Sequence, residues 1–358
     1  MEKITTAGWN EFFRNNFTEF ASAGYFPARV ISEHRESYII FSDSGEAEAQ
    51  VTGKFMFTAD TPSNYPKTGD WVAVSFTGED SPALIHAVLA RQTVFSRKTA
   101  GIKAERQILA ANVDTAFIVQ GLDDNYNPMR LTRFVTALSD TGIKPVIILN
   151  KSDLNPQSIA LADETRLLFP GTDTLCLSAL TGSGISEIEA YLKPGATCVF
   201  TGSSGVGKST IINSLLGVSE IETNEVSQKG SRGRHTTTAR QLYFLKSGAM
   251  MIDTPGIREL SLWTENGSAS GIPLIDKFAA ECRYRDCSHE NEPGCGVLAA
   301  HERGEIPEEI LKSFAKLKKE AQYLLSKIDE NAGVQRKKKE KQLGRAVKGF
   351  YKTSSKRR

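Results

Sequence analysis

The segment GSSGVGKST, residues 202–210, has the composition and spacing of a phosphate-binding loop. Small residues in such a loop let backbone N–H groups point into the bend and form a nest for the β-phosphate of a nucleotide. Lys208 would reach the β- and γ-phosphate oxygens, and the Ser209 hydroxyl would ligate Mg²⁺. We therefore expect the following residues to bind nucleotide: Gly202, Ser203, Ser204, Gly205, Val206, Gly207, Lys208, Ser209 and Thr210.

The tetrapeptide Asn150-Lys151-Ser152-Asp153 follows the apolar run PVIIL and is suited to reading guanine. The Asp153 carboxylate offers two acceptor oxygens to the adjacent N1–H and N2–H₂ donors of guanine. Adenine has no such donor pair, so it would leave a buried carboxylate unpaired, which is costly. Asn150 can contact the base or brace neighbouring loops, and the stem of Lys151 can cover the ring. The tetrapeptide therefore favours GTP over ATP.

Two further segments supply groups for the γ-phosphate and for Mg²⁺. In MMIDTPGI, Asp253 ends a strand, where it would hold Mg²⁺ through water, and Gly256 can offer its N–H to the γ-phosphate. GRHTTTAR, residues 233–240, contains hydroxyls of which one, on Thr237 or Thr238, would complete the Mg²⁺ shell. The sequence does not discriminate between these two threonines.

These elements occur in an unusual order along the chain. The base-reading loop comes first, and LSAL follows with Ser178 and Ala179, which fit the loop that supports guanine. The phosphate loop, the threonines and DTPG come later, whereas GTPases usually begin with the phosphate loop. Rotation of one order gives the other with nothing missing, and the termini of a domain often lie close together at its surface. We infer a circularly permuted α/β GTPase domain.

The cysteines fall into two groups. Cys282, Cys287, His289 and Cys295 form C-x₄-C-x-H-x₅-C, which suits a closed, structural tetrahedral Zn²⁺ site. The surrounding residues are polar turn material with little core of their own, so the metal would supply folding energy. The two remaining cysteines lie in apolar strand-like runs and are expected to be reduced core residues: Cys176 and Cys198.

The residue pattern and composition of the sequence divide the chain into four parts. Residues 1–100 combine a helix at 10–21 with five strand-like runs, ARVI, SYIIF, AQVTGKFMF, DWVAVSF and ALIHAVL, which predict an OB-like β-barrel that binds RNA. The alternative is a barrel that only packs on its neighbour. Residues 101–265 alternate buried strands with helical stretches, including ISEIEAYLK, and form the GTPase domain. Residues 266–330 are a zinc-binding, α-rich domain, and residues 331–358 are a basic tail.

The charge distribution indicates a polyanionic partner. The net charge of the whole chain is +2. The tail, residues 331–358, has eleven Lys or Arg and one acid, so its charge is +10. The other 330 residues therefore carry 2 − 10 = −8. The alternative is a solvated tail that only aids solubility. The chain has no apolar run of about eighteen residues, and its first residues lack a signal-peptide core. We expect a cytoplasmic monomer that does not bind membranes.

The motifs together resemble the RsgA (YjeQ) family of circularly permuted GTPases. The resemblance covers nearly the whole chain and includes LAANVD at 109–114, NKSD, GSSGVGKST, GRHTTT, DTPG and the cysteine-rich end. It implies hydrolysis of GTP to GDP and phosphate, stimulated by the small ribosomal subunit, and binding to the rRNA of that subunit during its late maturation. It also implies Mg²⁺ with GTP and one structural Zn²⁺.

The residue that positions the attacking water is not evident from the motifs. Ile257 follows DTPG, where many signalling GTPases have a glutamine, and an apolar side chain cannot orient water. His235, beside the threonines, is our candidate, with rRNA contact or packing as the alternative. The residues expected to take part in hydrolysis are Lys208, His235, Thr237 and Thr238.

Three other functions share part of this evidence. An ATPase or kinase would use the same phosphate loop, but Asp153 argues against it. A GTP-dependent RNA-binding switch with negligible turnover is compatible with Ile257. A GTPase that acts on tRNA or in translation would contain the same motifs and would differ only in the particle that it binds.

Overall fold

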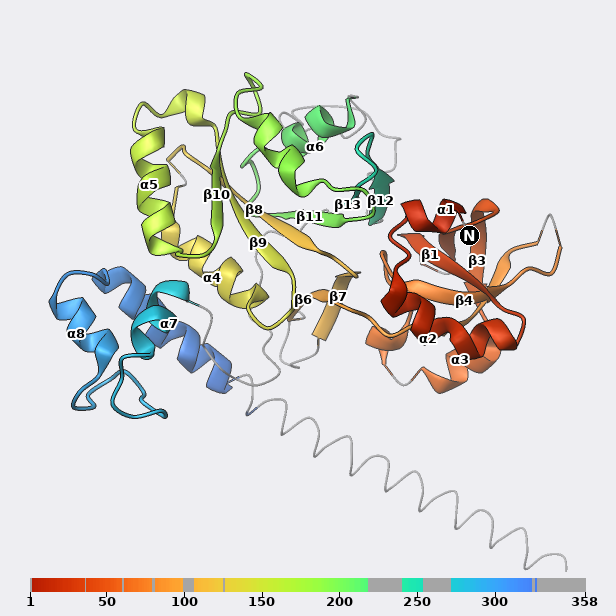
Figure 1. Cartoon of the computed structure of the whole chain (residues 1–358), viewed down its shortest axis with the longest axis horizontal. Coiled ribbons are helices and arrows are strands. Elements are labelled where there is room, and N and C mark those ends of the chain that lie inside the picture. Colours follow the sequence, from red (N-terminus) through yellow and green to blue (C-terminus); the bar gives the residue numbers. More distant parts are fainter. Residues whose placement is uncertain are drawn as a thin grey trace, which may run out of the picture.

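The computed structural model describes residues 2–35, 37–59, 61–78, 81–98, 106–124, 126–217, 240–253, 272–323 and 326. These residues form an N-terminal barrel, a central α/β sheet and a C-terminal group of helices (Figure 1). No helix in this part of the chain is long and apolar enough to cross a membrane.

Five strands close into the barrel, as the sequence predicts. They are β1 (Phe26–Glu33), β2 (Tyr38–Ser42), β3 (Gly45–Val51), β4 (Trp71–Ser75) and β5 (Ala83–Val88). The ring runs β1-β2-β3-β5-β4 and returns to β1, with β3 and β5 parallel. Two helices precede it, α1 (Glu2–Thr6) and α2 (Glu11–Ser22). α2 buries Phe13 and Phe17 beside Trp9. The ring centroids of Trp9 and Trp71 are 4.7 Å apart.

One predicted strand of the barrel is half helical. The run AQVTGKFMF ends its strand at Val51, and α3 (Gly53–Thr58) and η1 (Pro62–Asn64) follow. The Thr52 side chain accepts a hydrogen bond from the N–H of Phe55 and so caps the start of α3. Phe55 is buried, while Met56 and Phe57 are exposed. The aromatic composition typical of a strand is therefore overridden by the cap.

The central sheet has the strand order β10-β9-β8-β11-β13-β12. Its strands are β8 (Thr115–Gly121), β9 (Lys144–Asn150), β10 (Asp173–Cys176), β11 (Thr197–Thr201), β12 (Gln241–Phe244) and β13 (Met250–Asp253). All neighbouring pairs are parallel except β12 and β13. Three helices accompany them, α4 (Pro128–Leu138), α5 (Ser158–Leu168) and α6 (Lys208–Leu216). A separate two-stranded ribbon, β6 (Val94–Lys98) and β7 (Arg106–Ala111), connects the barrel to this sheet.

The stretch ISEIEAYLK is a 3₁₀-helix, η3 (Ile185–Tyr191), and not the α-helix that its pattern predicts. Gly184 precedes it in the left-handed conformation without a capping side chain. Pro194 disfavours helical geometry at the residue before it, so the segment cannot extend further as a helix, and short helical pieces are where 3₁₀ geometry occurs. Another 3₁₀ turn, η2 (Ser152–Leu154), begins inside the predicted base-reading tetrapeptide.

The barrel and the central sheet are joined edge to edge. β1 pairs with β12 at Ser32 and Gln241, so the eleven strands form one continuous sheet. Beyond the central sheet, the C-terminal helices are α7 (Pro273–Ala279), α8 (Gly296–Glu302) and a helix described over 308–323. The last helix buries Ile310, Phe314 and Leu317 in the shared core.

Candidate nucleotide site and metal centre

Asn150, at the end of β9, connects three loops of the candidate nucleotide site. Its Nδ2 donates a hydrogen bond to the carbonyl of Val206 in the phosphate loop, at 2.8 Å. Its Oδ1 accepts from the N–H of Ala179, at 2.9 Å. The side chain is buried, with 2% exposed. Of the two roles open to Asn150 from the sequence, the structure shows the brace.

The rest of the tetrapeptide is less buried, with Lys151 and Ser152 half-buried. Lys151 adopts a left-handed conformation, with φ of 66°, and its Nζ pairs with Asp123 at 2.8 Å. The N–H of Ser152 donates to the carbonyl of Leu177, which holds the tetrapeptide to the end of β10. Asp153 is exposed. Its carboxylate is therefore accessible to a base.

The base-supporting loop is held by its own hydrogen bonds. Ser178 is buried, and its Oγ accepts from the N–H of Thr181 at 3.2 Å. Its N–H donates to the carbonyl of Ser183. Ala179, the next residue, is half-buried and faces Asn150 through its own N–H. The loop thus lies between the tetrapeptide and η3.

Two glycines of the phosphate loop are required by close approaches. Gly202 has φ of 139°, and a Cβ there would lie 2.2 Å from the carbonyl oxygen of Val119. Gly207 has φ of 93°, and a Cβ there would lie 2.2 Å from Nδ2 of Asn150. Either side chain would displace the backbone or the brace, so only glycine fits.

The crest of the phosphate loop faces solvent at Ser204 and Gly205, while Val206 is buried beneath it. Gly205 has φ of 76°. α6 begins directly after Gly207, with Ser209 and Thr210 in its first turn. The positive end of the helix and the exposed loop therefore point to the same place, as phosphate binding requires.

Lys208 lies folded against its own loop. Its Nζ donates to the carbonyls of Gly202 at 2.8 Å and of Ser203 at 2.7 Å. Burial lowers the pKa of Lys208 to about 8, and the nearby Asp253 carboxylate, at the end of β13, opposes that shift. The Ser209 hydroxyl and the Asp253 carboxylate are hard oxygen donors of the kind that Mg²⁺ prefers.

Four of the predicted nucleotide-site residues lie outside the described residues: His235, Thr237, Thr238 and Gly256. Two side chains that the sequence did not suggest do lie at the site. Asp123 pairs with Lys151, and Arg130, in the first turn of α4, donates to the Ser203 hydroxyl. Both follow β8 and its carboxyl end, which is the position in a parallel sheet where ligand-binding residues gather.

The cysteine-rich segment brings four ligand atoms together. Those of Cys282, Cys287, His289 and Cys295 all lie within 4.8 Å of one another. The two sulfurs of Cys282 and Cys295 are 3.9 Å apart, and Nδ1 of His289 lies 3.5 and 3.4 Å from them. Zn–S bonds of about 2.3 Å in a tetrahedron place sulfurs about 3.8 Å apart. The geometry therefore fits a four-coordinate metal.

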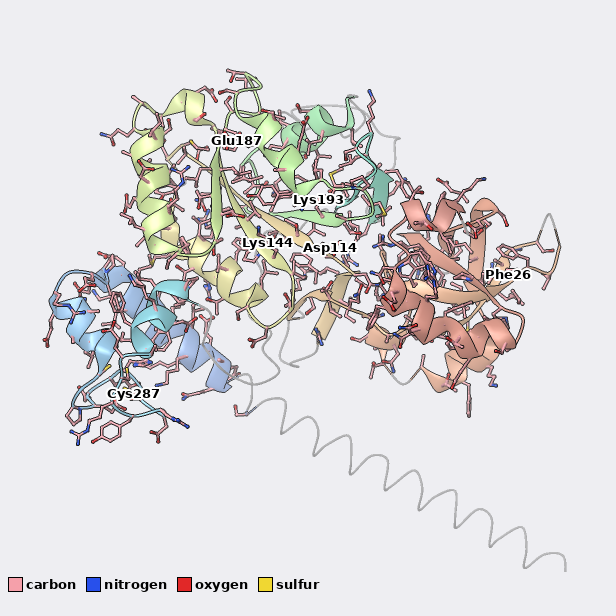
Figure 2. The ribbon with its side chains drawn as sticks, viewed as in Figure 1. Phe26, Asp114, Lys144, Glu187, Lys193 and Cys287 are labelled. Carbon is pink, nitrogen blue, oxygen red and sulfur yellow. The ribbon has the colours of Figure 1, made fainter. Side chains whose placement is uncertain are left out.

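Hydrogen bonds to the sulfurs and to one carboxylate support this cluster. Burial alone would raise the pKa of Cys282, but the backbone N–H groups of Val297 and Gly296 hold that pKa below its ordinary value. Glu292 accepts from the N–H groups of three neighbours and from the Ser288 hydroxyl, which lowers the pKa of Glu292 to about 2. Figure 2 shows Cys287 on the loops beneath α7 and α8.

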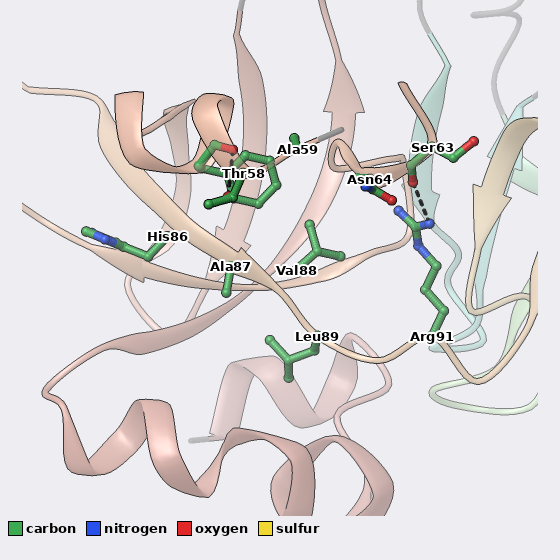
Figure 3. Close-up of a pocket in the computed structure, with 10 residues that line it drawn as sticks. Thr58, Ala59, Ser63, Asn64, His86, Ala87, Val88, Leu89 and Arg91 are labelled. Atoms are coloured by element: carbon green, nitrogen blue, oxygen red, sulfur yellow. Dashed lines mark hydrogen bonds between the residues drawn. The ribbon is translucent and has the colours of Figure 1, made fainter. Parts of the chain in front are cut away.

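A separate pocket of about 490 Å³ lies in the barrel, between α3 and β5 (Figure 3). His86, Val88 and Arg91 line it together with Phe55 and Asn64. Arg91 is already engaged, because its guanidinium pairs with Asp70 and donates to the carbonyl of Ser63. None of the residues predicted to bind GTP or metal lines this pocket.

Comparisons with known proteins agree with this geometry. The family model described as RsgA GTPase matches residues 88–263. The small ribosomal subunit biogenesis GTPase RsgA of Opitutus terrae is 41% identical over 336 residues, which covers 91% of this chain and 92% of that protein. The chain belongs to the RsgA GTPase family. A second RsgA, from Syntrophotalea carbinolica, is 39% identical and is covered over 97% of its length.

Solved structures support the same fold. The crystal structure of YjeQ from Thermotoga maritima has a TM-score of 0.64 and 26% identity, over 83% of this chain and 99% of that one. YloQ, described as a circularly permuted GTPase, has a TM-score of 0.61 at 21% identity and covers 83% of this chain and 95% of its own. The permuted fold predicted from the motif order is thereby confirmed, as is membership of a family of GTP hydrolases. A family model described as 50S ribosome-binding GTPase also matches, at residues 197–352.

Proposed function

We propose that this RsgA-family GTPase binds the small ribosomal subunit through its rRNA and assists late maturation of that subunit in the cytoplasm. The bridge made by Asn150 supports the GTP site most directly, because it holds the base-reading loop, the base-supporting loop and the phosphate loop together. The partner is supported by the relatives, which are named small ribosomal subunit biogenesis GTPases and match this chain over most of its length. We further propose domain boundaries near residues 100, 265 and 330.

The roles of the residues follow from their chemistry. The exposed carboxylate of Asp153 pairs with the N1–H and N2–H₂ of guanine. The loop N–H groups and Lys208 hold the β- and γ-phosphates, and Lys208 exchanges its two loop carbonyls for phosphate oxygens when GTP binds. Ser209 would ligate Mg²⁺ and Asp253 would hold it through water, and the ion would neutralise charge on the phosphates. Thr237 or Thr238 completes that shell, and Gly256 contacts the γ-phosphate.

The metal of the C-terminal cluster is proposed to be one Zn²⁺. Three thiolates and an imidazole are soft and intermediate ligands, which favour zinc over magnesium or calcium. All four ligand positions come from the protein, so the role is structural. The loops that carry the ligands bury few apolar side chains, and metal binding would contribute to their folding.

Hydrolysis is proposed to depend on His235 and on the bound subunit. The chain has Ile257 where a water-orienting glutamine often lies, so turnover by the free protein should be slow. We expect purified small subunits to accelerate phosphate release, and His235→Ala to reduce the stimulated rate by about a hundredfold. The measurement is GTP turnover with and without subunits, for both proteins.

Purified large subunits serve as the control particle, since one matching family model is named for them. Stimulation by large but not small subunits would contradict the proposed partner. Slow turnover that neither particle accelerates would favour a GTP-dependent binding switch instead. A full stimulated rate in His235→Ala would remove His235 from the mechanism without affecting the assignment of the partner.

A further inference from the structure

Arg130, in the first turn of α4, contacts the phosphate loop through a side-chain hydrogen bond. Nη1 of Arg130 donates a hydrogen bond to Oγ of Ser203 at 2.9 Å. The backbone of this turn is fixed, because the Asn127 side chain caps α4 by accepting from the N–H groups of Met129 and Arg130. The guanidinium therefore extends to the phosphate loop from the capped first turn of a helix, and not from a loop.

The position of Arg130 in the first turn is unfavourable for the stability of α4. A positive charge in the first turn opposes the helix dipole, and α4 has no acidic residue there to offset it. Within the part of the chain that the structure describes, no carboxylate pairs with Arg130. Arg133, one turn further on, instead pairs with Glu320 of the C-terminal helix. The partner of Arg130 in the described residues is thus the Ser203 hydroxyl of the phosphate loop, and a residue that breaks a local preference is often retained for function.

Two cations meet at Ser203. Arg130 binds its hydroxyl, while Nζ of Lys208 binds its carbonyl at 2.7 Å. Ser203 is half-buried and directly precedes the exposed crest of the loop. Arg130 therefore fixes the residue that precedes the exposed part of the loop, and it adds a positive charge beside the place where the phosphates would lie.

We propose that Arg130 is a positioning residue for the nucleotide phosphates: acting through Ser203, it holds the phosphate loop in its binding geometry and contributes charge to phosphate binding. This inference rests on the proposed assignment of residues 202–210 as the phosphate site. It predicts a phosphate-specific effect. Guanosine, which lacks phosphates, should bind independently of Arg130, whereas GDP and GTP should not.

The test compares Arg130→Ala, Arg130→Lys and Ser203→Ala in the full-length protein. Affinities for GTP, GDP and guanosine are measured by calorimetry, together with kcat and KM for GTP. Loss of a hydrogen bond to a charged group predicts that Arg130→Ala weakens GTP and GDP binding by about ten- to a hundredfold. Arg130→Lys, which keeps the charge, should recover part of this loss. We expect KM to rise more than kcat falls.

Three controls make the outcome decisive. Arg133→Ala removes a neighbouring arginine of α4 without touching the loop and should leave GTP affinity unchanged. The double variant of Arg130→Ala and Ser203→Ala should be no weaker than Arg130→Ala alone, since the two residues share one interaction. Lys208→Ala should abolish GTP binding; if it does not, the phosphate-site assignment itself is wrong. GTP affinity within twofold of wild type in Arg130→Ala, or an equal loss for guanosine and GTP, would overturn the inference.

Discussion

At the scale of single residues, Asn150 and Asp153 belong to one tetrapeptide but lie in different surroundings. Asn150 is buried, and both ends of its amide are bound to protein groups. Asp153 is exposed, so its carboxylate remains accessible to a ligand. The two residues are therefore expected to contribute to the site in separate ways: Asn150 holds the loops together, and Asp153 is proposed to select the base.

Replacement of Asp153 should change the choice of base without changing stability. In Asp153→Asn, one carboxylate oxygen becomes an amide donor, which matches the C2 carbonyl of xanthine and no longer matches the C2 amino group of guanine. We expect GTP affinity to fall by roughly ten- to a hundredfold and XTP affinity to rise. Competition between GTP and XTP in a binding assay measures both changes.

Asn150→Ala is the contrasting control for this experiment. It leaves the Val206 carbonyl and the Ala179 N–H without their partner, so the free energy of unfolding should fall by about 2–4 kcal/mol. Asn155→Ala, which removes a half-buried hydrogen bond to the Leu122 carbonyl and an exposed one from the N–H of Gln157, should cost only about 0.5–1.5 kcal/mol. If Asp153→Asn were destabilised as much as Asn150→Ala, the division of roles would be wrong.

At the scale of elements, a buried arginine fastens the barrel to the central sheet. Arg29, on β1, is 2% exposed and donates to the carbonyls of Ala7, Gly69 and Asn112. It also donates to the Thr197 hydroxyl on β11, at 2.8 Å. Burial lowers the pKa of Arg29 to about 10, so the guanidinium stays charged at neutral pH.

The joint formed by Arg29 should contribute strongly to stability. Arg29→Met keeps the apolar stem but removes the side-chain donor of the Ala7 and Asn112 carbonyls, while the Gly69 carbonyl keeps its hydrogen bond from Nδ2 of Asn112. We expect a loss of about 3–5 kcal/mol in the free energy of unfolding. Urea denaturation measures it. Arg35→Met, at an exposed site, should change the free energy of unfolding by less than about 0.5 kcal/mol. Equal midpoints for the two variants would show that Arg29 does not fasten the joint.

The elements also show what a single sequence can and cannot predict. The strands of the central sheet are near-continuous apolar runs, such as that of β9, which are readily predicted because both faces are buried. The pairing of β1 with β12 was not predicted, because it joins residues about two hundred positions apart and β12 is only four residues long. α3 was misread because its apolar composition is typical of a strand.

The same contrast holds at the site. The approach of the four metal-ligand residues could be predicted, since their spacing is local in sequence, while the roles of the GTP motifs stay predictions. The sequence could not predict whether Asn150 contacts the base or braces the neighbouring loops, because its partner Val206 lies 56 residues away. Arg130 was missed for a similar reason: its partner Ser203 lies 73 residues away, and nothing beside Arg130 in the sequence indicates a phosphate loop.

At the scale of the whole molecule, charge is separated along the chain. The last 28 residues carry +10 and the remaining 330 carry −8. An acidic body is repelled by a polyanion such as rRNA, so attraction must come from local groups. The tail, 331–358, lies outside the described residues, and its composition alone makes it the strongest candidate for phosphate contact.

Deletion of residues 331–358 should therefore flatten the salt dependence of binding to small subunits. Each phosphate that a cation neutralises contributes about 0.7–0.9 to the slope of log K against log salt. We expect wild type to lose affinity steeply between low and high salt and the truncated protein to lose it less, as measured by co-sedimentation across a salt series. A variant with four tail lysines, at 337, 338, 339 and 341, replaced by glutamine keeps the length and should fall between the two. Equal affinity of wild type at low and high salt would show that the tail does not bind phosphates, and equal slopes for wild type and the glutamine variant would show that these lysines are not the groups in contact.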